Sequence, residues 1–238
     1  GWFIMGKKGE PVTTYKKPKS SSSVIVNPEE SDEFNKPTLG LQWQWHANYH
    51  QFFGMPTAFG TMRVFTYKQD GGAKNLWNVP NMLLQKTPAD RFTATTKLRF
   101  TAKADGQYGG FIMMGLDYSA LVVKRVGNEF RLIQMTCKSA DKGNAQSETL
   151  IATLRPTAVD KVNYKPAIHE DIYLRMTVND GMMQFAWSQN GKKFTTCGEP
   201  FKMREGKWIG AKIGFVAADT NPNADKGWID ADWIRITK

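Results

Sequence analysis

The feature that most constrains the fold of this 238-residue chain is a strict alternation of apolar and polar residues between short turn sequences. Within the stretch 172–178 the polar positions are Tyr173, Arg175 and Thr177, and every residue between them is apolar. An Asn-Asp-Gly turn follows at 179–181, the stretch 183–187 repeats the alternation, and an Asn-Gly pair follows at 190–191. Alternation between such turns predicts antiparallel strands that bury one face.

The same period of two recurs in other short segments, at 62–64, 92–100, 130–132 and 213–217. The stretch 111–123 is more continuously apolar, which is typical of central strands. No segment has a long helical period. We therefore expect an all-β fold, a two-sheet antiparallel β-sandwich of the jelly-roll type.

The bulk composition is compatible with one large domain. Hydrophobic residues make up 41% of the chain, enough to bury a sizeable core. No run of eighteen apolar residues occurs, so no membrane span is expected. The N-terminus lacks a basic-then-apolar segment, so no signal peptide is expected, and we expect the chain to begin inside a larger protein.

Residues 1–28 differ from the rest of the chain, which we assign to one domain at 29–238. The segments 2–5 and 11–15 read as strands around a turn at 6–9, and 16–23 is a Lys/Pro/Ser linker. A lone two-stranded hairpin is marginally stable in water, so these residues are expected to pack on another domain or on the sandwich.

The formal net charge of +10 fits a nucleic acid or an anionic polymer as partner, or simply a solvated surface. The cations are spread along the chain, and their densest group, Lys16, Lys17 and Lys19, lies in the linker. No nucleic-acid-binding motif is present, so we expect no nucleic-acid partner. Cys137 and Cys197 belong to no CxxC pair; two buried free thiols are favoured over one disulfide.

Catalytic motifs are missing from the sequence. A glycosidase needs two carboxylates at a defined separation, and the E-x-D-x-x-E strand pattern of some sandwich enzymes is absent. There is no G-x-S-x-G, P-loop or H-E-x-x-H motif. We therefore predict no catalytic residues, although single carboxylates are available at Asp32, Glu33, Asp117, Glu129, Asp230 and Asp232. His46 and His50 lack a third metal ligand.

The segment 41–46 is the strongest binding candidate. Sugars are bound by flat aromatic rings beside amide and imidazole groups, and Trp43, Gln44, Trp45 and His46 supply that chemistry. The alternative is that the alternating tryptophans fill the core, which we favour for at least one of them.

Seven ordered stretches of the chain carry a family resemblance: 30–34 (ESDEF), 39–45 (LGLQWQW), 81–86 (NMLLQK), 108–111 (YGGF), 187–194 (WSQNGKKF), 210–215 (GAKIGF) and 231–236 (ADWIRI). They resemble the C-terminal concanavalin-like domain of glycoside hydrolase family 43, which includes β-xylosidases and α-L-arabinofuranosidases. Residues 1–28 resemble the last strands and linker of the preceding catalytic propeller.

The resemblance implies an accessory domain that packs on the propeller, because the catalytic base, pKa-modulating aspartate and general acid of the family all lie in that propeller. One loop of such a domain reaches the active site. Here it corresponds to Met203–Ile213, so Trp208 is a sugar-contact candidate, and Lys212 stands where an aromatic ring is expected. The implied ligands are xylan-derived oligosaccharides, and a periplasmic or secreted location is favoured.

The resemblance also implies a structural calcium ion where the terminal strands meet. The candidate ligands are Asp32 and Glu33 near the start and Asp230 and Asp232 near the end. Alternation predicts that Asp230 and Asp232 share a strand face that Ile234 and Ile236 continue. The alternative is that these carboxylates pair with lysine or arginine, or cap turns.

Two other functions stay open: a freestanding carbohydrate-binding module, and a basic binder of nucleic acid or anionic polymer. The propeller-like N-terminal segment favours the accessory domain over the first. The lack of a concentrated basic stripe counts against the second.

Overall fold

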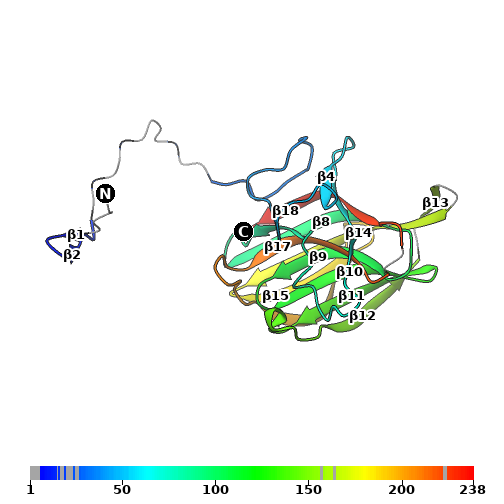
Figure 1. Cartoon of the computed structure of the whole chain (residues 1–238). Coiled ribbons are helices and arrows are strands. Elements are labelled where there is room, and N and C mark those ends of the chain that lie inside the picture. The colour runs from blue at the N-terminus through cyan, green and yellow to red at the C-terminus, as the bar shows by residue number, and fades with distance from the viewer. Residues whose placement is uncertain are drawn as a thin grey trace.

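The computed structural model describes residues 6–14, 16, 19, 24, 27–155, 158–162, 165–221 and 224–238. Apart from a short two-stranded sheet near the N-terminus, they form two large, almost entirely antiparallel sheets that pack against each other (Figure 1). The predicted two-sheet β-sandwich is therefore confirmed. The described part has one helical element, the 3-10 turn η1 (Ala140–Lys142), and none of its helices has the length and apolar character needed to cross a membrane.

The first sheet has the strand order β12 (Ser147–Leu154), β11 (Glu129–Cys137), β10 (Tyr118–Val126), β9 (Gln107–Met114), β17 (Lys212–Asp219), β7 (Leu83–Lys86), β3 (Gln44–Trp45), and β6 (Tyr67–Lys68) pairs with β17. The second has the order β16 (Thr195–Lys202), β15 (Met182–Ser188), β14 (Lys165–Asn179), β8 (Arg91–Ala102), β18 (Trp228–Thr237), β5 (Met62–Phe65), β4 (Gly54–Pro56), and β13 (Ala158–Val162) pairs with β14. The continuously apolar stretch 111–123 forms the interior strands β9 and β10, as expected.

The core lies between the sheets and follows the alternation in the sequence. On β14 the side chains of Ile172, Leu174 and Met176 are fully buried, whereas Tyr173 and Arg175 are half-buried on the opposite face. Burying one such aliphatic side chain contributes about 1.5–3 kcal/mol relative to exposure. The amphipathic pattern thus sets which face of each strand points inward.

The two sheets differ on their outer faces. Residues 69–81 cover the outer face of the first sheet, where Leu76, Val79 and Met82 join a second apolar cluster with Tyr108 and Tyr118. Strands β9 and β17 are consequently buried along their whole length. On the second sheet, β8 alternates buried residues with half-buried and exposed ones. We call the outward surface of β14, β8 and β18 the open face.

The turn between β14 and β15 has the geometry that its sequence predicts. Asp180 and Gly181 have φ angles of 48° and 80°, and Asn179 pairs directly with Met182. Positive φ at both central residues defines a type I′ turn, whose twist matches that of the strands it joins.

At the N-terminus the structure corrects two expectations: the turn is shorter than predicted, and residues 12–14 of the predicted strand at 11–15 lie outside any strand. β1 (Gly6–Lys7) and β2 (Glu10–Pro11) form a two-stranded sheet joined by Lys8 and Gly9, so the turn is shorter than the predicted 6–9. Lys8 and Gly9 have φ angles of 56° and 85°, which allows a two-residue turn. The predicted strand at 2–5 lies outside the described residues.

Candidate functional site

Trp43 belongs to the core. Its side chain is buried and its ring stacks on Phe215 with centroids 5.9 Å apart. The indole Nε1 donates a hydrogen bond of 2.8 Å to Asp32 Oδ2. The sequence analysis favoured a core position for at least one of the two tryptophans, and the structure shows this for Trp43.

Trp45 points to the same side and is half-buried against the core. Its ring lies 5.8 Å from both Tyr49 and Phe53, measured between centroids. Tyr49 is 60% exposed, so an aromatic cluster around Trp45 reaches the surface at this end of the sandwich.

His46 points to the opposite side of β3, toward Trp77. Its Nε2 donates to the Trp77 carbonyl oxygen at 3.0 Å, and its Nδ1 is buried without a hydrogen-bond partner. Burial lowers the pKa of His46, and the charge of Lys212 lowers that pKa further. His46 is therefore held as a neutral imidazole.

Lys212 begins β17 and is only 7% exposed, and burial lowers the pKa of its ammonium. Within the described ranges, no carboxylate lies within ion-pair distance of it. The loop just before it carries Trp208, which is 93% exposed, and Ile209, which is 44% exposed. The structure thus brings together a largely buried lysine without a carboxylate partner, an unsatisfied imidazole nitrogen and an exposed indole. We call Lys212, His46 and the 203–211 loop the docking corner.

Asp117 is a buried carboxylate with two cationic partners. Its oxygens contact Lys138 at 3.2 Å and Arg204 at 3.3 Å, and Oδ1 accepts the Ser139 amide at 2.7 Å. Burial acts to raise the pKa of Asp117, but the Ser139 amide and the two cations outweigh burial and lower that pKa. Such a group stays ionised and anchors a loop; it does not donate protons as a general acid would.

The ends of the described sandwich meet, as the calcium hypothesis requires. Asp32 and Ile234 exchange two backbone hydrogen bonds of 2.8 Å. Asp32 Oδ1 accepts the Phe34 amide, and Glu33 forms a bidentate pair with Arg235 at 2.8 and 3.0 Å. The hydrogen bond from Arg235 lowers the pKa of Glu33.

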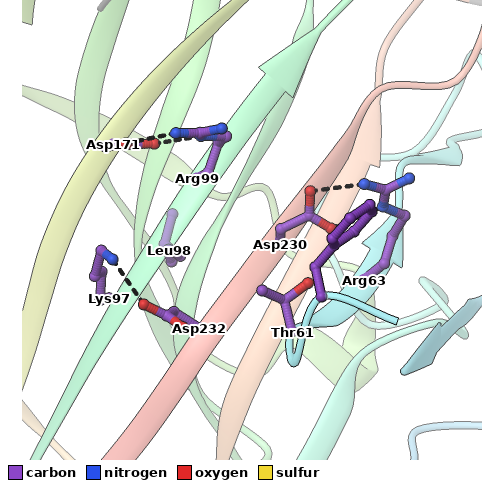
Figure 2. A pocket seen from close by; sticks show the side chains of 9 residues that line it. Thr61, Arg63, Lys97, Leu98, Arg99, Asp171, Asp230 and Asp232 are labelled. Carbon is purple, nitrogen blue, oxygen red and sulfur yellow. Dashed lines mark hydrogen bonds and ion pairs between the residues drawn. The ribbon is translucent and has the colours of Figure 1, made fainter. Parts of the chain in front are cut away.

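Asp230 and Asp232 lie on the open face, each with its own cation (Figure 2). Asp230 forms a bidentate pair with Arg63 at 2.7 and 2.8 Å, and Asp232 contacts Lys97 at 2.7 Å. These are the lysine and arginine contacts of the alternative interpretation.

The expectation that Ile234 continues the face of Asp230 and Asp232 is wrong. The register of β18 against β8 shifts between Ala231 and Trp233, which leaves Asp232 as the extra residue of a β-bulge. After the bulge the alternation is inverted, so Trp233 joins the open face while Ile234 is fully buried in the core.

No group of three or more histidine, cysteine or carboxylate side chains in the described part of the chain is placed to hold a metal ion. The calcium ion stays a prediction, tested by a melting curve with and without a chelator, because an ion that binds only the folded state raises its stability.

The sequence analysis missed a group of side chains that the sheet register assembles on the open face. Tyr173, Arg175, Phe194 and Trp233 line a hollow of about 560 Å³. Tyr173 and Arg175 occupy outward positions of the alternating strand, so their direction could have been read from the pattern. Trp233 could not, because its direction depends on the bulge.

Cys137 and Cys197 are both free and buried, as the sequence analysis favoured. Burial raises the pKa of the Cys197 thiol to about 11, and burial also raises that of Cys137. Both thiols are therefore protonated at neutral pH and serve as small apolar groups in the packing.

The two-sheet sandwich defines the class of this protein, the concanavalin A-like β-sandwich domains. Within that class the chain belongs to the family of β-xylosidase C-terminal concanavalin A-like domains, whose model matches residues 31–237. The resemblance to the C-terminal domain of glycoside hydrolase family 43 is thereby confirmed.

Similar proteins are longer than this chain. A β-xylosidase of Formosa agariphila is 26% identical over 259 residues, covering 98% of this chain and 40% of that protein. The non-reducing end α-L-arabinofuranosidase BoGH43B of Bacteroides ovatus is 28% identical over 144 residues, covering 58% of this chain and 26% of that protein. The structure of the GH43 BlXynB protein from Bacillus licheniformis shares the fold, with a TM-score of 0.67 at 19% identity, covering 90% of this chain and 40% of that one. The chain thus spans less than half the length of these relatives.

Proposed function

We propose that this chain is the non-catalytic accessory domain of a xylan- or arabinoxylan-degrading glycoside hydrolase. It packs on the catalytic propeller through the docking corner and presents the 203–211 loop to the sugar-binding pocket. Membership of the family and the partial coverage of its enzymes support this assignment.

The observation that carries the proposal is the incomplete state of the docking corner. A largely buried lysine without a carboxylate and a buried imidazole nitrogen without a donor are both costly unless a partner completes them. Lys212 and His46 provide these two groups beside the exposed ring of Trp208. A second surface that supplies a carboxylate would pair with Lys212 and would cover the Trp208 indole, whereas His46 Nδ1 needs a hydrogen-bond donor. Indole rings are frequent anchors at interfaces.

The test measures binding of this chain to the separately purified catalytic propeller of the parent enzyme, together with turnover of an aryl xyloside by the mixture. We expect a stable complex. Trp208→Ala and Lys212→Ala should each weaken it on the order of tenfold or more. Leu150→Ala is the matched control, because Leu150 is 57% exposed on the far edge strand β12 and should have no effect.

The result that contradicts the proposal is equal binding by wild type, Trp208→Ala and Lys212→Ala. The alternative, a freestanding carbohydrate-binding module, requires submicromolar binding of neutral xylo-oligosaccharides by this chain alone and loss of that binding in Trp45→Ala. Micromolar binding corresponds to about 8 kcal/mol.

A further inference from the structure

The open face carries two neighbouring hollows on the side of the sandwich opposite to the docking-corner sheet. The larger, of about 560 Å³, spans β8, β14, β18 and the 189–194 loop, and the other, of about 410 Å³, contains the ion pairs of Figure 2. Lys97 lines both, so they adjoin each other. Together they form one extended surface on the open face.

The lining of the larger hollow has the chemistry of a sugar site. Three rings border it, those of Tyr173, Phe194 and Trp233, and Tyr173 and Trp233 lie 6.2 Å apart between centroids. The lining also includes the hydroxyl- and amide-bearing residues Thr93, Thr95, Thr237 and Asn190. Flat rings that accept sugar C–H faces, surrounded by polar groups for the hydroxyls, are the usual composition of a small-ligand site.

Arg175 adds a fixed positive charge at the centre of this lining. Its guanidinium stacks on the Phe194 ring with 3.6 Å between the guanidinium carbon and the ring centroid. Its Nε donates to Thr95 Oγ1 at 3.1 Å. Stacking and one hydrogen bond hold the planar group in place and leave both terminal nitrogens to donate in parallel, the arrangement that recognises a carboxylate in bidentate fashion.

The ion pairs of the open face leave Arg175 without an anionic partner among the described residues. Neighbouring carboxylates are engaged: Asp171 with Arg99 at 2.6 Å and Asp232 with Lys97 at 2.7 Å. Over the residues that the structure describes, Arg175 has no carboxylate within ion-pair distance. The loop that carries Phe194 also carries the exposed Lys192 and Lys193, which add positive charge at the rim.

We propose that the open face binds an oligosaccharide that carries a uronic acid, with its carboxylate on the terminal nitrogens of Arg175 and sugar faces on Trp233 and Tyr173. The chain of the ligand continues over Lys97 into the second hollow, where Phe59, which is 90% exposed, borders the far side. The expectation of a xylose backbone rests on the proposed function, whereas recognition of the carboxylate does not.

The test uses titration calorimetry of the whole chain with xylotetraose bearing one glucuronic acid and with unsubstituted xylotetraose. We expect the acidic oligomer to bind about tenfold tighter or more, because a charge-assisted bidentate hydrogen bond is added. Arg175→Gln should abolish this preference. The matched control is Arg91→Gln, which also removes one positive charge from the open face. Arg91 lies on β8, outside both hollows, where it pairs with Asp180.

Equal binding of the two oligomers would overturn the proposal, as would an equal loss in Arg91→Gln and Arg175→Gln, which would indicate general charge attraction. Backbone amide shifts of the wild-type chain provide a readout that needs no variant. They should move at Tyr173, Phe194 and Trp233 on addition of the acidic oligomer; movement confined to Trp45 and Trp208 contradicts the site. Displacement of the oligomer by equimolar single-stranded DNA would also contradict it.

Tetragalacturonate, which is acidic but lacks xylose, separates this proposal from the proposed function. Binding of both acidic oligomers supports the open-face site, and binding of tetragalacturonate alone supports the site while counting against a xylan ligand. Failure of the propeller to bind the docking corner leaves the titration result unchanged, because the titration involves this chain alone.

Discussion

At the scale of single residues, burial and the presence of an oppositely charged partner determine the charge state of the ionisable groups. Glu33, Asp230 and Asp232 each have a basic partner, whereas His46 and Lys212 are buried together with none that is acidic. The pKa values of His46 and Lys212 are lowered in consequence, mainly by burial. Burial disfavours the protonated forms of both groups in the folded state, which makes their region sensitive to pH.

His46 should therefore make stability depend on pH. An unfolded histidine titrates near 6.5, and the folded pKa of His46 is lower. Between the two values the unfolded state binds more protons, so stability falls as pH falls through about 6.5. We expect the difference in melting temperature between pH 7.5 and 5.5 to shrink in His46→Gln and to persist in His50→Gln, the exposed control. Identical pH profiles for wild type and His46→Gln would refute this.

At the scale of the elements, local backbone geometry determines how consecutive strands are joined and which side of the sheet a side chain faces. The Asp180–Gly181 turn sets the register of β14 and β15, and the bulge at Asp232 sends Trp233 to the open face. One single-residue substitution tests each feature.

Gly181→Ala tests the turn. A Cβ at Gly181 meets no atom within 4 Å, so its effect is conformational and arises from the φ angle of 80°. An alanine in left-handed geometry costs about 1–2 kcal/mol, which should appear as a lower denaturation midpoint. Gly72→Ala is the control, because its Cβ also meets open space and its backbone needs no positive φ. Equal midpoints for the two variants would contradict the type I′ assignment.

Thr96→Val tests the bulge. The buried Thr96 hydroxyl donates to the Trp233 carbonyl oxygen at 2.7 Å, directly beside the register shift. Valine has a similar shape but no donor, so the carbonyl loses a partner and unfolding free energy should fall by about 1–2 kcal/mol. Thr93→Val on the same strand, where the hydroxyl contact to Thr177 is exposed and 3.4 Å long, should change stability little. A loss of equal size in both variants would show that the hydroxyl at the bulge has no special role.

At the scale of the whole molecule, the two sheets have different outer surroundings. Residues 69–81 cover the first sheet, and the second presents the open face with its rings and cations. The docking corner lies on the first sheet, so the proposed propeller docking and the proposed oligosaccharide binding use separate surfaces. This separation of surfaces is compatible with the proposed accessory role.

The purified chain should therefore release no nitrophenol from aryl xylosides or arabinosides above the buffer rate, because a glycosidase needs a positioned acid and base pair. The measurement is absorbance over a long incubation with a high protein concentration. Turnover that survives repurification and disappears in Asp117→Asn would refute the accessory role.

Much of the fold could be predicted from the sequence because side-chain alternation and turn residues are local properties. The strands at 62–64, 92–100 and 172–178, and the Asp180–Gly181 turn, follow from neighbours along the chain. The candidate site was predicted less well. Of the two tryptophans in 41–46, alternation could not say which would be buried, because both point to the same side of β3 and their depth depends on the packing partners.

The sequence by itself determined the all-β class, the inward face of most strands and the turn between β14 and β15. The tertiary structure alone decided the contacts between distant strands, such as Arg63 with Asp230, 167 positions apart, and the lack of an acidic partner for Arg175. It also decided the direction of Trp233. The physical reason is that alternation repeats every two residues within one strand, whereas partners and bulges depend on the register between strands.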